Sequence, residues 1–241
     1  MPTPQLSRGI FAVIAVVALT AGCGVTQSEP DVSAAKPVEN QAPAIDSLVT
    51  AGWLSEHLDE PGLVVLDCTV MVEQTEDGSM QSVNGRASYE DGHIPSAGFA
   101  DLLRDLADRD SELQFAVPTP EAFAAAMGAL GVGDDSRVVL YAANGSSWAA
   151  RVWWMLRWIG FDRAAVLDGG LAAWTAEGLP LSTEPSDRAP AVLTPAPRPE
   201  LIADRDEVLA AINDDSVHII DVLPEPHYRG EMVMYDRPGH I

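Results

Sequence analysis

A short loop in the middle of the chain has the composition of an anion-binding site. The loop, AANGSSW at residues 142–148, directly follows the β-rich run RVVLY at 137–141. Small residues and a glycine let backbone N–H groups approach a ligand, and the start of a helix adds the positive end of its dipole. Arg151, expected in the first turn of that helix, would add a full positive charge. The alternative is an ordinary strand-to-helix connection, and the candidate anion-binding residues are Gly145, Ser146, Ser147 and Arg151.

Candidate nucleophiles and bases are few. The chain has two cysteines, Cys23 and Cys68, so no disulfide framework is expected. Cys68 follows an apolar run, where a free cysteine is more often a small buried hydrophobe than a catalytic thiol. His93 and His240 each stand in a Gly-His-Ile turn, where we expect glycine to permit the reversal, isoleucine to enter the core and histidine to bond to the backbone. A general base is the alternative for these histidines. No set of Cys, His and carboxylate residues has metal-ligand spacing, so no metal site is predicted.

The charge balance excludes one class of partner. The chain of 241 residues carries 36 acidic against 14 basic residues, for a formal net charge of −22. Such a surface repels phosphate backbones, so nucleic acid is not an expected partner. Hydrophobic residues make up 47% of the sequence, which is enough for a packed core and unlike an acidic disordered tail.

The elements that must position these residues alternate between strand and helix patterns. Strands are predicted at 62–68, 137–141 and 164–170, and helices at 119–131, 149–160 and 171–178. This alternation favours an α/β fold with a mostly parallel sheet covered by helices on both faces. Ligands bind such sheets at the carboxyl ends of strands, so the loops after Asp67, Tyr141 and Leu167 are candidate ligand-binding segments. Asp67 and Asp221, each at the end of a strand pattern, are interpreted as structural or pocket-edge residues.

The N-terminus has the pattern of an export signal. Arg8 precedes an apolar run at 10–19 that is shorter than the roughly 20 residues needed to span a bilayer, and LTAGC ends at Cys23. This ending resembles a bacterial lipobox, which implies a signal peptide at 1–22 and a lipid on Cys23. An ordinary signal with a chance cysteine is the alternative. Residues 23–45 have the composition of a flexible tether. The predicted location is the extracytoplasmic face of the cell membrane, held by the lipid anchor.

Three motifs in the same order resemble the N-terminal domain of a tandem rhodanese, a thiosulfate sulfurtransferase. They are GRASYEDGHIPSAG, VVLYAANGSSWAARVWWMLRWIGF and VLDGGLAAWTAEGLPL. The resemblance implies a rhodanese-like α/β domain at 46–184, a Pro-rich linker at 185–200 and the start of a second rhodanese-like domain, an incomplete copy, at 201–241. It further implies a cysteine nucleophile in the second domain, a first domain without catalysis and no cofactor.

The family pattern places its nucleophile directly after the strand that corresponds to 137–141. Ala142 occupies that position here, and alanine cannot carry sulfur. The first domain is therefore expected to be non-catalytic, with no catalytic residue among its loop residues.

An internal repeat predicts where the missing nucleophile belongs. HIIDV at 218–222 matches VVLDC at 64–68, and DRPGHI at 236–241 matches YEDGHI at 89–94. A helix with an apolar stripe at Val208, Leu209 and Ile212 precedes the expected strand at 218–222, and Tyr228-Arg229-Gly230 fits the family's Y-x-G. Ala142 lies 49 residues beyond His93, so the same spacing from His240 falls near position 289. We therefore expect these 241 residues to be a form truncated in the second domain, without the reactive cysteine.

Three functions are compatible with these patterns. The first is a lipid-anchored tandem rhodanese, which would move sulfane sulfur from a small sulfur-containing anion such as thiosulfate to a thiophile such as cyanide. The second is a non-catalytic, membrane-anchored lipoprotein that uses the rhodanese-like domain for binding or interaction. The third is a secreted substrate-binding protein, which fits the lipobox but not the repeat.

Overall fold

Five parallel strands form the central sheet. The computed structural model describes residues 45–76, 80–145 and 147–231. The strands lie in the order β1 (Leu48–Val49), β7 (Ala164–Leu167), β6 (Arg137–Tyr141), β2 (Leu63–Asp67) and β5 (Gly98–Phe99). Every residue of β2, β6 and β7 is buried, because a parallel sheet covered on both faces offers its side chains no solvent on either side.

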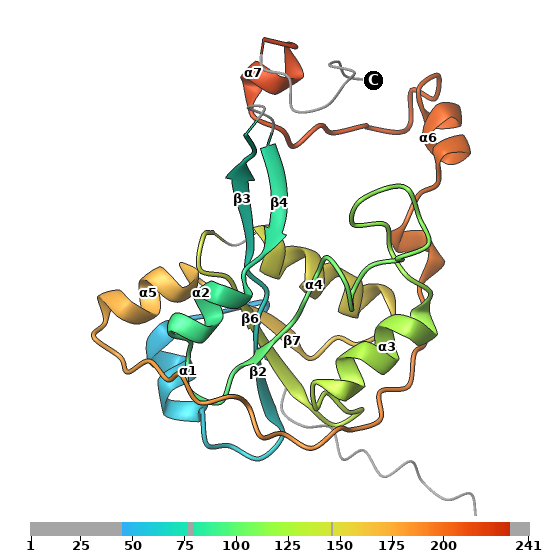
Figure 1. The fold of residues 1–241 in the computed structure, drawn as a ribbon. Helices are drawn as coiled ribbons and strands as arrows, with labels where there is room; N and C mark the ends of the chain where they lie inside the picture. Colours follow the sequence, from blue (N-terminus) through green and yellow to red (C-terminus); the bar gives the residue numbers. More distant parts are fainter. Residues whose placement is uncertain (1–44, 77–79, 146, 232–241) are drawn as a thin grey trace, which may run out of the picture. The chain divides into compact units, whose positions relative to one another are not determined.

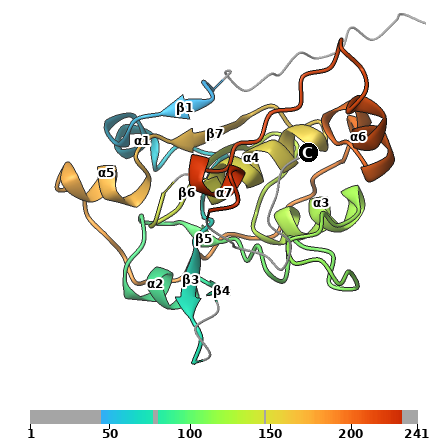
Figure 2. The ribbon, with the colours of Figure 1, turned by 90° about the horizontal axis from the view of Figure 1, so that it is seen from above.

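Helices cover both faces of this sheet, as Figures 1 and 2 show. One face packs against α3 (Pro120–Ala129) and α4 (Ser147–Trp158). The other packs against α1 (Ala51–His57), α2 (Arg86–Asp91) and α5 (Gly170–Ala176). The predicted α/β fold, with a mostly parallel sheet between helical layers, is confirmed.

The core consists of two clusters because successive strand residues point to opposite faces. In β2, Val64 and Leu66 face α3 and α4, while Leu63 and Val65 face the other layer. The first cluster also contains Phe123, Met127, Val152, Met155 and Leu156. The second contains Leu54, Ile94 and Trp174, all without solvent exposure.

The predicted boundaries of the long helices agree with the structure to within two residues. Thr119 caps α3 by accepting a hydrogen bond from the Ala122 amide at 3.2 Å, and Pro120 occupies the first helical position. Helix α4 begins at Ser147, two residues before the predicted start, and Gly160 follows it with φ of +87°. A left-handed residue at a helix end favours glycine, which explains this stop signal.

An antiparallel hairpin separates β2 from α2 and was not predicted. Its strands are β3 (Val70–Gln74) and β4 (Met80–Asn84), which pair only with each other. Apart from Val70, the side chains of β3 are exposed, so the hairpin lacks the buried face that would have given a clear alternating pattern.

The Gly-His-Ile turn at 92–94 is structural, and the expected role fails only for its glycine. Ile94 is fully buried, as predicted. Gly92 has φ of 165°, which is extended backbone that any residue adopts, so the predicted glycine-dependent reversal is wrong. A β-carbon on Gly92 would lie 3.2 Å from the Leu181 side chain, so a larger residue would fit only if Leu181 moved.

His93 ties this turn to a distant segment. Its ring is buried and stacks on Tyr89 at 3.9 Å between centroids. Its Nδ1 lies 2.7 Å from the Tyr89 carbonyl oxygen, and its Nε2 lies 2.9 Å from that of Glu184. The expectation that this histidine bonds to the backbone is confirmed.

The Pro-rich segment at 185–200 packs along the domain in an extended conformation. The Ala191 amide donates to the Gly128 carbonyl at 2.9 Å, and the Ala196 amide donates to that of Ile159 at 2.8 Å. Arg198 pairs with Asp162 at 2.5 Å. Added β-carbons on Gly128 and Gly160 would lie only 2.6 and 2.4 Å from backbone oxygens of this segment. The two glycines therefore let it approach the domain closely.

The expected strand at 218–222 is absent from the described structure, and that prediction is wrong. The region contains the 3-10 turn η1 (Pro199–Leu201), α6 (Arg205–Ala211) and α7 (Glu225–Tyr228). The predicted helix is present as α6, with a capping box between Asp204 and Glu207, but Leu209 is 53% exposed. Ile220 and Val222 are 78% and 90% exposed, and no strand among the described residues pairs with this segment to supply ladder hydrogen bonds. Residues 236–241, the second copy of the Gly-His-Ile turn, lie outside the described residues.

We predict that Gly128→Ala destabilises the protein while Gly52→Ala does not. Both glycines lie within helices, where alanine has the higher helix propensity. The new β-carbon at position 128 would clash with the Ala191 carbonyl, whereas at position 52 the nearest atom lies 3.5 Å away. We expect Gly128→Ala to lower the free energy of unfolding by about 1–3 kcal/mol in urea denaturation. Equal stability of the two variants would contradict the close packing of the segment at 185–200.

Candidate functional site

The loops that follow β2, β6 and β7 are the three candidate ligand-binding segments, and they meet at the carboxyl edge of the sheet. The Ala143 amide donates to Thr69 Oγ1 at 2.9 Å, and Asn144 Nδ2 donates to the Val70 carbonyl at 2.7 Å. The Leu171 amide donates to the Ala142 carbonyl at 3.2 Å. Residues 142–144 are therefore joined to both neighbouring loops by hydrogen bonds.

Ala142 lies at the centre of this arrangement and is 1% exposed. Gly169 and Gly170 follow β7 with φ of +73° and +56°, a left-handed conformation that disfavours side chains. A β-carbon on Gly170 would lie 2.5 Å from the Ala142 carbonyl oxygen. The Asp-Gly-Gly motif thus allows the start of α5 to pack directly on the backbone of residue 142.

The four predicted anion-binding residues differ in how the structure places them. Gly145 has φ of +113° and is exposed, and Ser147 is exposed at the start of α4. Ser146 lies outside the described residues. The Ala143 amide, which the sequence left available to a ligand, is bonded to Thr69.

Arg151 lies further along its helix than predicted and makes a contact that was not predicted. Because α4 begins at Ser147, Arg151 falls in the second turn of the helix. Its guanidinium donates to the Phe115 carbonyl and lies 5.9 Å from the centroid of that ring. The Phe115 ring stacks on Trp148 at 4.9 Å, and its backbone has φ of +63°. The Arg151 side chain therefore contacts a residue with left-handed backbone conformation in the loop between β5 and α3.

Cys68 is a core residue. It has no solvent exposure and packs among the apolar side chains of the α3 and α4 face. Burial, with a smaller contribution from the charge of Asp67, raises the pKa of its thiol well above the ordinary value. Because its thiol has no solvent access and no thiolate character, Cys68 has the properties of a small hydrophobic residue, as predicted.

Asp67 is a buried carboxyl group beside this loop. It is 1% exposed, and its Oδ1 accepts hydrogen bonds from the amide (2.8 Å) and hydroxyl of Thr69. Burial raises its pKa, and the two bonds from Thr69 oppose that rise. Burial and the charge of Asp67 also raise the pKa of Tyr141, whose hydroxyl accepts from the Ile94 amide at 3.2 Å. Asp67 thus anchors Thr69, which in turn holds the loop at 142–147.

Sequence reasoning missed three residues of this site, namely Thr69, Asn144 and Phe115. Thr69 had a recognisable signal, because a hydroxyl residue two places after an aspartate forms a local side-chain turn. The bond of Asn144 to Val70 and the conformation of Phe115 depend on loops that meet only in the folded chain.

The described residues give two further observations. Residues 45–76, 80–145 and 147–231 contain no group of three His, Cys, Asp or Glu side chains arranged to hold a metal ion. Within the same ranges, no helix has the length and apolar character required to cross a membrane.

The fold and the three converging loops define a known class of domain. The rhodanese-like domain family matches residues 50–177, and the chain belongs to this family. A probable 3-mercaptopyruvate sulfurtransferase of Pseudomonas aeruginosa is 37% identical over 199 residues, covering 80% of this chain and 68% of the relative. The thiosulfate sulfurtransferase of Bos taurus is 31% identical over 199 residues, covering 80% of this chain and 64% of the relative.

The solved structures agree with this assignment. A crystal structure of a 3-mercaptopyruvate sulfotransferase from Escherichia coli superimposes with a TM-score of 0.71 and 34% identity. The match covers 82% of this chain and 72% of that one. The chain spans about two thirds of the length of the relatives it matches.

We predict that Asp67→Asn raises the thermal midpoint at neutral pH. The pKa of Asp67 is higher in the folded than in the unfolded chain, so its contribution to stability is full below the ordinary value of 3.8 and is lost as the pH rises through the folded-state pKa. Asparagine keeps the acceptor for Thr69 and removes the buried charge. The increase in the thermal midpoint should therefore become smaller as the pH is lowered towards about 4.

The matched control is Asp168→Asn, an exposed carboxylate at the same edge of the sheet, which should change the midpoint little. Thermal unfolding followed by circular dichroism measures both variants across the pH range. A lower midpoint for Asp67→Asn at neutral pH would contradict the prediction that the buried charge destabilises the fold.

Proposed function

We propose that this protein is a sulfurtransferase that acts on small sulfur-containing anions such as thiosulfate or 3-mercaptopyruvate. The observation that carries the proposal is the rhodanese-like match over residues 50–177, within which the loops after β2, β6 and β7 converge on residue 142. The relatives named above are sulfurtransferases of these two types.

The proposed reaction needs a cysteine but no cofactor. A thiolate attacks the outer sulfur of thiosulfate, so that an S–S bond forms to the enzyme, the S–S bond of thiosulfate breaks and sulfite leaves. Cyanide then takes the outer sulfur of the persulfide as thiocyanate and restores the thiolate. Both steps conserve electrons, because the sulfane sulfur moves between nucleophiles without an external oxidant.

We assign the reactive thiol to a second rhodanese-like domain that begins at 201–241. Within the described domain, Ala142 stands at the nucleophile position and Cys68 is buried with a raised pKa. The proposal is supported by the sequence repeat of the Gly-His-Ile motif, from which we expect the corresponding cysteine near position 289. The domain at 46–184 then supports the reaction without carrying sulfur.

A second candidate function is binding without catalysis. The buried methyl group of Ala142 favours it, because the position that carries chemistry in the family pattern is here filled by an inert side chain. In that case the rhodanese-like domain would serve a membrane-anchored lipoprotein as an interaction module.

We predict that the 241-residue chain forms thiocyanate from thiosulfate and cyanide no faster than its Cys68→Ser variant. Colorimetric detection of thiocyanate from the purified protein measures this. A longer product of the same reading frame, with a cysteine near position 289, should be active and should lose its activity when that cysteine is replaced by serine.

Two outcomes would contradict the assignment of the thiol. Turnover by the 241-residue chain that disappears in Cys68→Ser would place the chemistry in the first domain. A reading frame that closes directly after codon 241, together with an inactive protein, would favour the binding module.

We also propose that Cys23 carries a lipid that holds the protein at the extracytoplasmic face of the membrane. The support is the apolar run at 10–19 followed by LTAGC. In cells labelled with a tagged fatty acid, the wild-type chain should incorporate label and Cys23→Ala should not. Incorporation by Cys23→Ala, or none by the wild type, would refute the anchor.

A further inference from the structure

The described residues include two Asn-Gly pairs, Asn84-Gly85 and Asn144-Gly145. In such a pair the main-chain nitrogen of glycine can attack the side-chain carbonyl of asparagine, because glycine has no side chain that hinders the approach. Both asparagine residues are exposed, and each pair lies within two residues of the start of a helix. Neither the local sequence nor the exposure of the asparagine therefore distinguishes the two pairs.

The surrounding contacts hold Asn84-Gly85 in place. The Gly85 amide donates to the Thr69 carbonyl at 2.9 Å, so its nitrogen is engaged. Gly85 is buried, and a β-carbon on it would lie 2.5 Å from the Thr69 side chain. The amide of Asn84 is held at both ends, since Nδ2 donates to Asp101 Oδ2 at 3.1 Å and Oδ1 accepts from the Arg86 amide at 3.3 Å.

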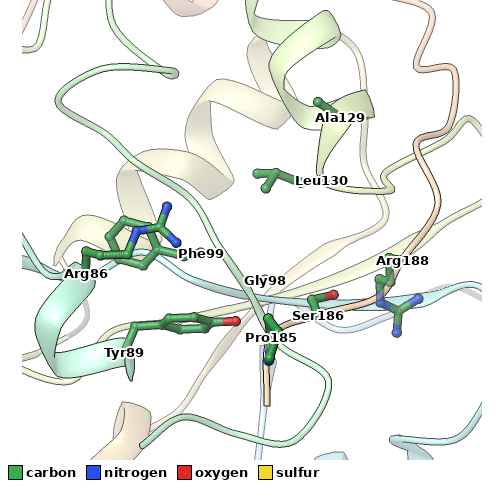
Figure 3. A pocket seen from close by; sticks show the side chains of 9 residues that line it. All are labelled: Arg86, Tyr89, Gly98, Phe99, Ala129, Leu130, Pro185, Ser186 and Arg188. Atoms are coloured by element: carbon green, nitrogen blue, oxygen red, sulfur yellow. The ribbon is translucent and has the colours of Figure 1, made fainter. Parts of the chain in front are cut away.

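Helix α2 adds a further restraint at this pair. Arg86, its first residue, places its guanidinium carbon 4.4 Å from the centroid of the Phe99 ring (Figure 3). The Tyr89 amide donates to the Gly85 carbonyl at 3.0 Å, which fixes the other side of the glycine. Attack by the Gly85 nitrogen on its neighbour would therefore require several contacts to break together.

The glycine of Asn144-Gly145 has no such restraints. Gly145 is exposed with φ of +113°, and an added β-carbon would meet no atom beyond its chain neighbours within 4 Å. Within residues 45–76, 80–145 and 147–231, no hydrogen bond engages the Gly145 amide. Asn144 Nδ2 donates to the Val70 carbonyl at 2.7 Å and lies 3.7 Å from the Met71 sulfur. These contacts hold one end of the side chain and leave the nitrogen of the glycine available.

We propose that Asn144-Gly145 undergoes spontaneous deamidation in the folded protein and that Asn84-Gly85 is protected from it. The Gly145 nitrogen attacks Asn144 Cγ and gives its proton to water, so that a C–N bond forms, the Cγ–Nδ2 bond breaks and ammonia leaves. Water then opens the resulting succinimide ring, at Cγ to give aspartate or at the main-chain carbonyl to give isoaspartate. One water molecule replaces one ammonia, and no oxidant is consumed.

The modification removes a bond that positions the loop after β6. Aspartate has no donor for the Val70 carbonyl, so the contact at 2.7 Å becomes one between two acceptors. Isoaspartate in addition lengthens the main chain of the loop by a methylene group. The bond from the Ala143 amide to Thr69 is then left as the tie to the loop after β2. This inference does not rest on the proposed function, because it concerns the chemistry of the Asn-Gly pair.

Peptide mapping by mass spectrometry on the full chain tests the proposal. The purified protein is incubated in mildly alkaline buffer, and the deamidated fraction is followed at both pairs. We expect Asn144 to react at least about tenfold faster than Asn84, because breaking the contacts of Gly85 adds to the barrier. In denaturing urea the two rates should converge, because the two dipeptides are identical and the tertiary contacts are lost.

Matched substitutions assign the signal. Labelling by an isoaspartate methyltransferase should be largely lost in Asn144→Gln, whose longer side chain closes a ring less readily, and retained in Asn84→Gln. Asn144→Asp reproduces one product, and hydrogen exchange of the Ala143 amide should be about threefold faster or more in that variant.

The peptide mapping uses the wild-type chain, so it decides the matter even where a variant folds poorly. Equal rates at the two pairs in the folded protein would overturn the proposal. So would an Asn144 that stays intact in the folded protein while both pairs react in urea. Unchanged exchange of the Ala143 amide in Asn144→Asp would contradict the effect on the loop.

Discussion

The burial of both faces of β2 and β6 is the constraint on which the rest of the structure depends. All side chains from Leu63 to Asp67 and from Arg137 to Tyr141 are removed from solvent. A strand in that position can carry reactive or charged groups only where it ends, because the interior of the sheet offers them no hydration. The loops at the carboxyl edge therefore hold the polar residues, and Asp67 is kept buried because it bonds to Thr69.

Glycine positions decide how closely other segments approach this core. Gly170 lets α5 contact the backbone at Ala142, while Gly128 and Gly160 let the segment at 185–200 bond to α3 and α4. This segment was expected only as a linker between domains. Its packing places Pro185, Ser186 and Arg188 beside α2 and β5, where these segments together line a cavity (Figure 3).

The candidate site combines the architecture of a sulfurtransferase with an inert residue at its centre. Thr69, Asn144 and the paired glycines after β7 keep the loop at 142–147 in position, although Ala142 cannot accept sulfur. The framework of such a site is maintained by hydrogen bonds and close backbone contacts, so it does not require the nucleophile itself. In the proposed function, this domain supports chemistry that a thiol outside it carries out.

Local signals in the sequence were sufficient to predict the buried strands and α3 with its Thr119 cap, and to identify the alanine at position 142. Continuous apolar runs, capping residues and residue identity do not depend on distant partners. The tertiary structure alone decided that Arg151 bonds to Phe115, that Arg86 and Arg188 line one cavity, and that residues 218–222 form no strand. Each of these outcomes depends on which segments meet, since a guanidinium needs an acceptor and a strand needs a neighbour, and neither partner is adjacent in sequence.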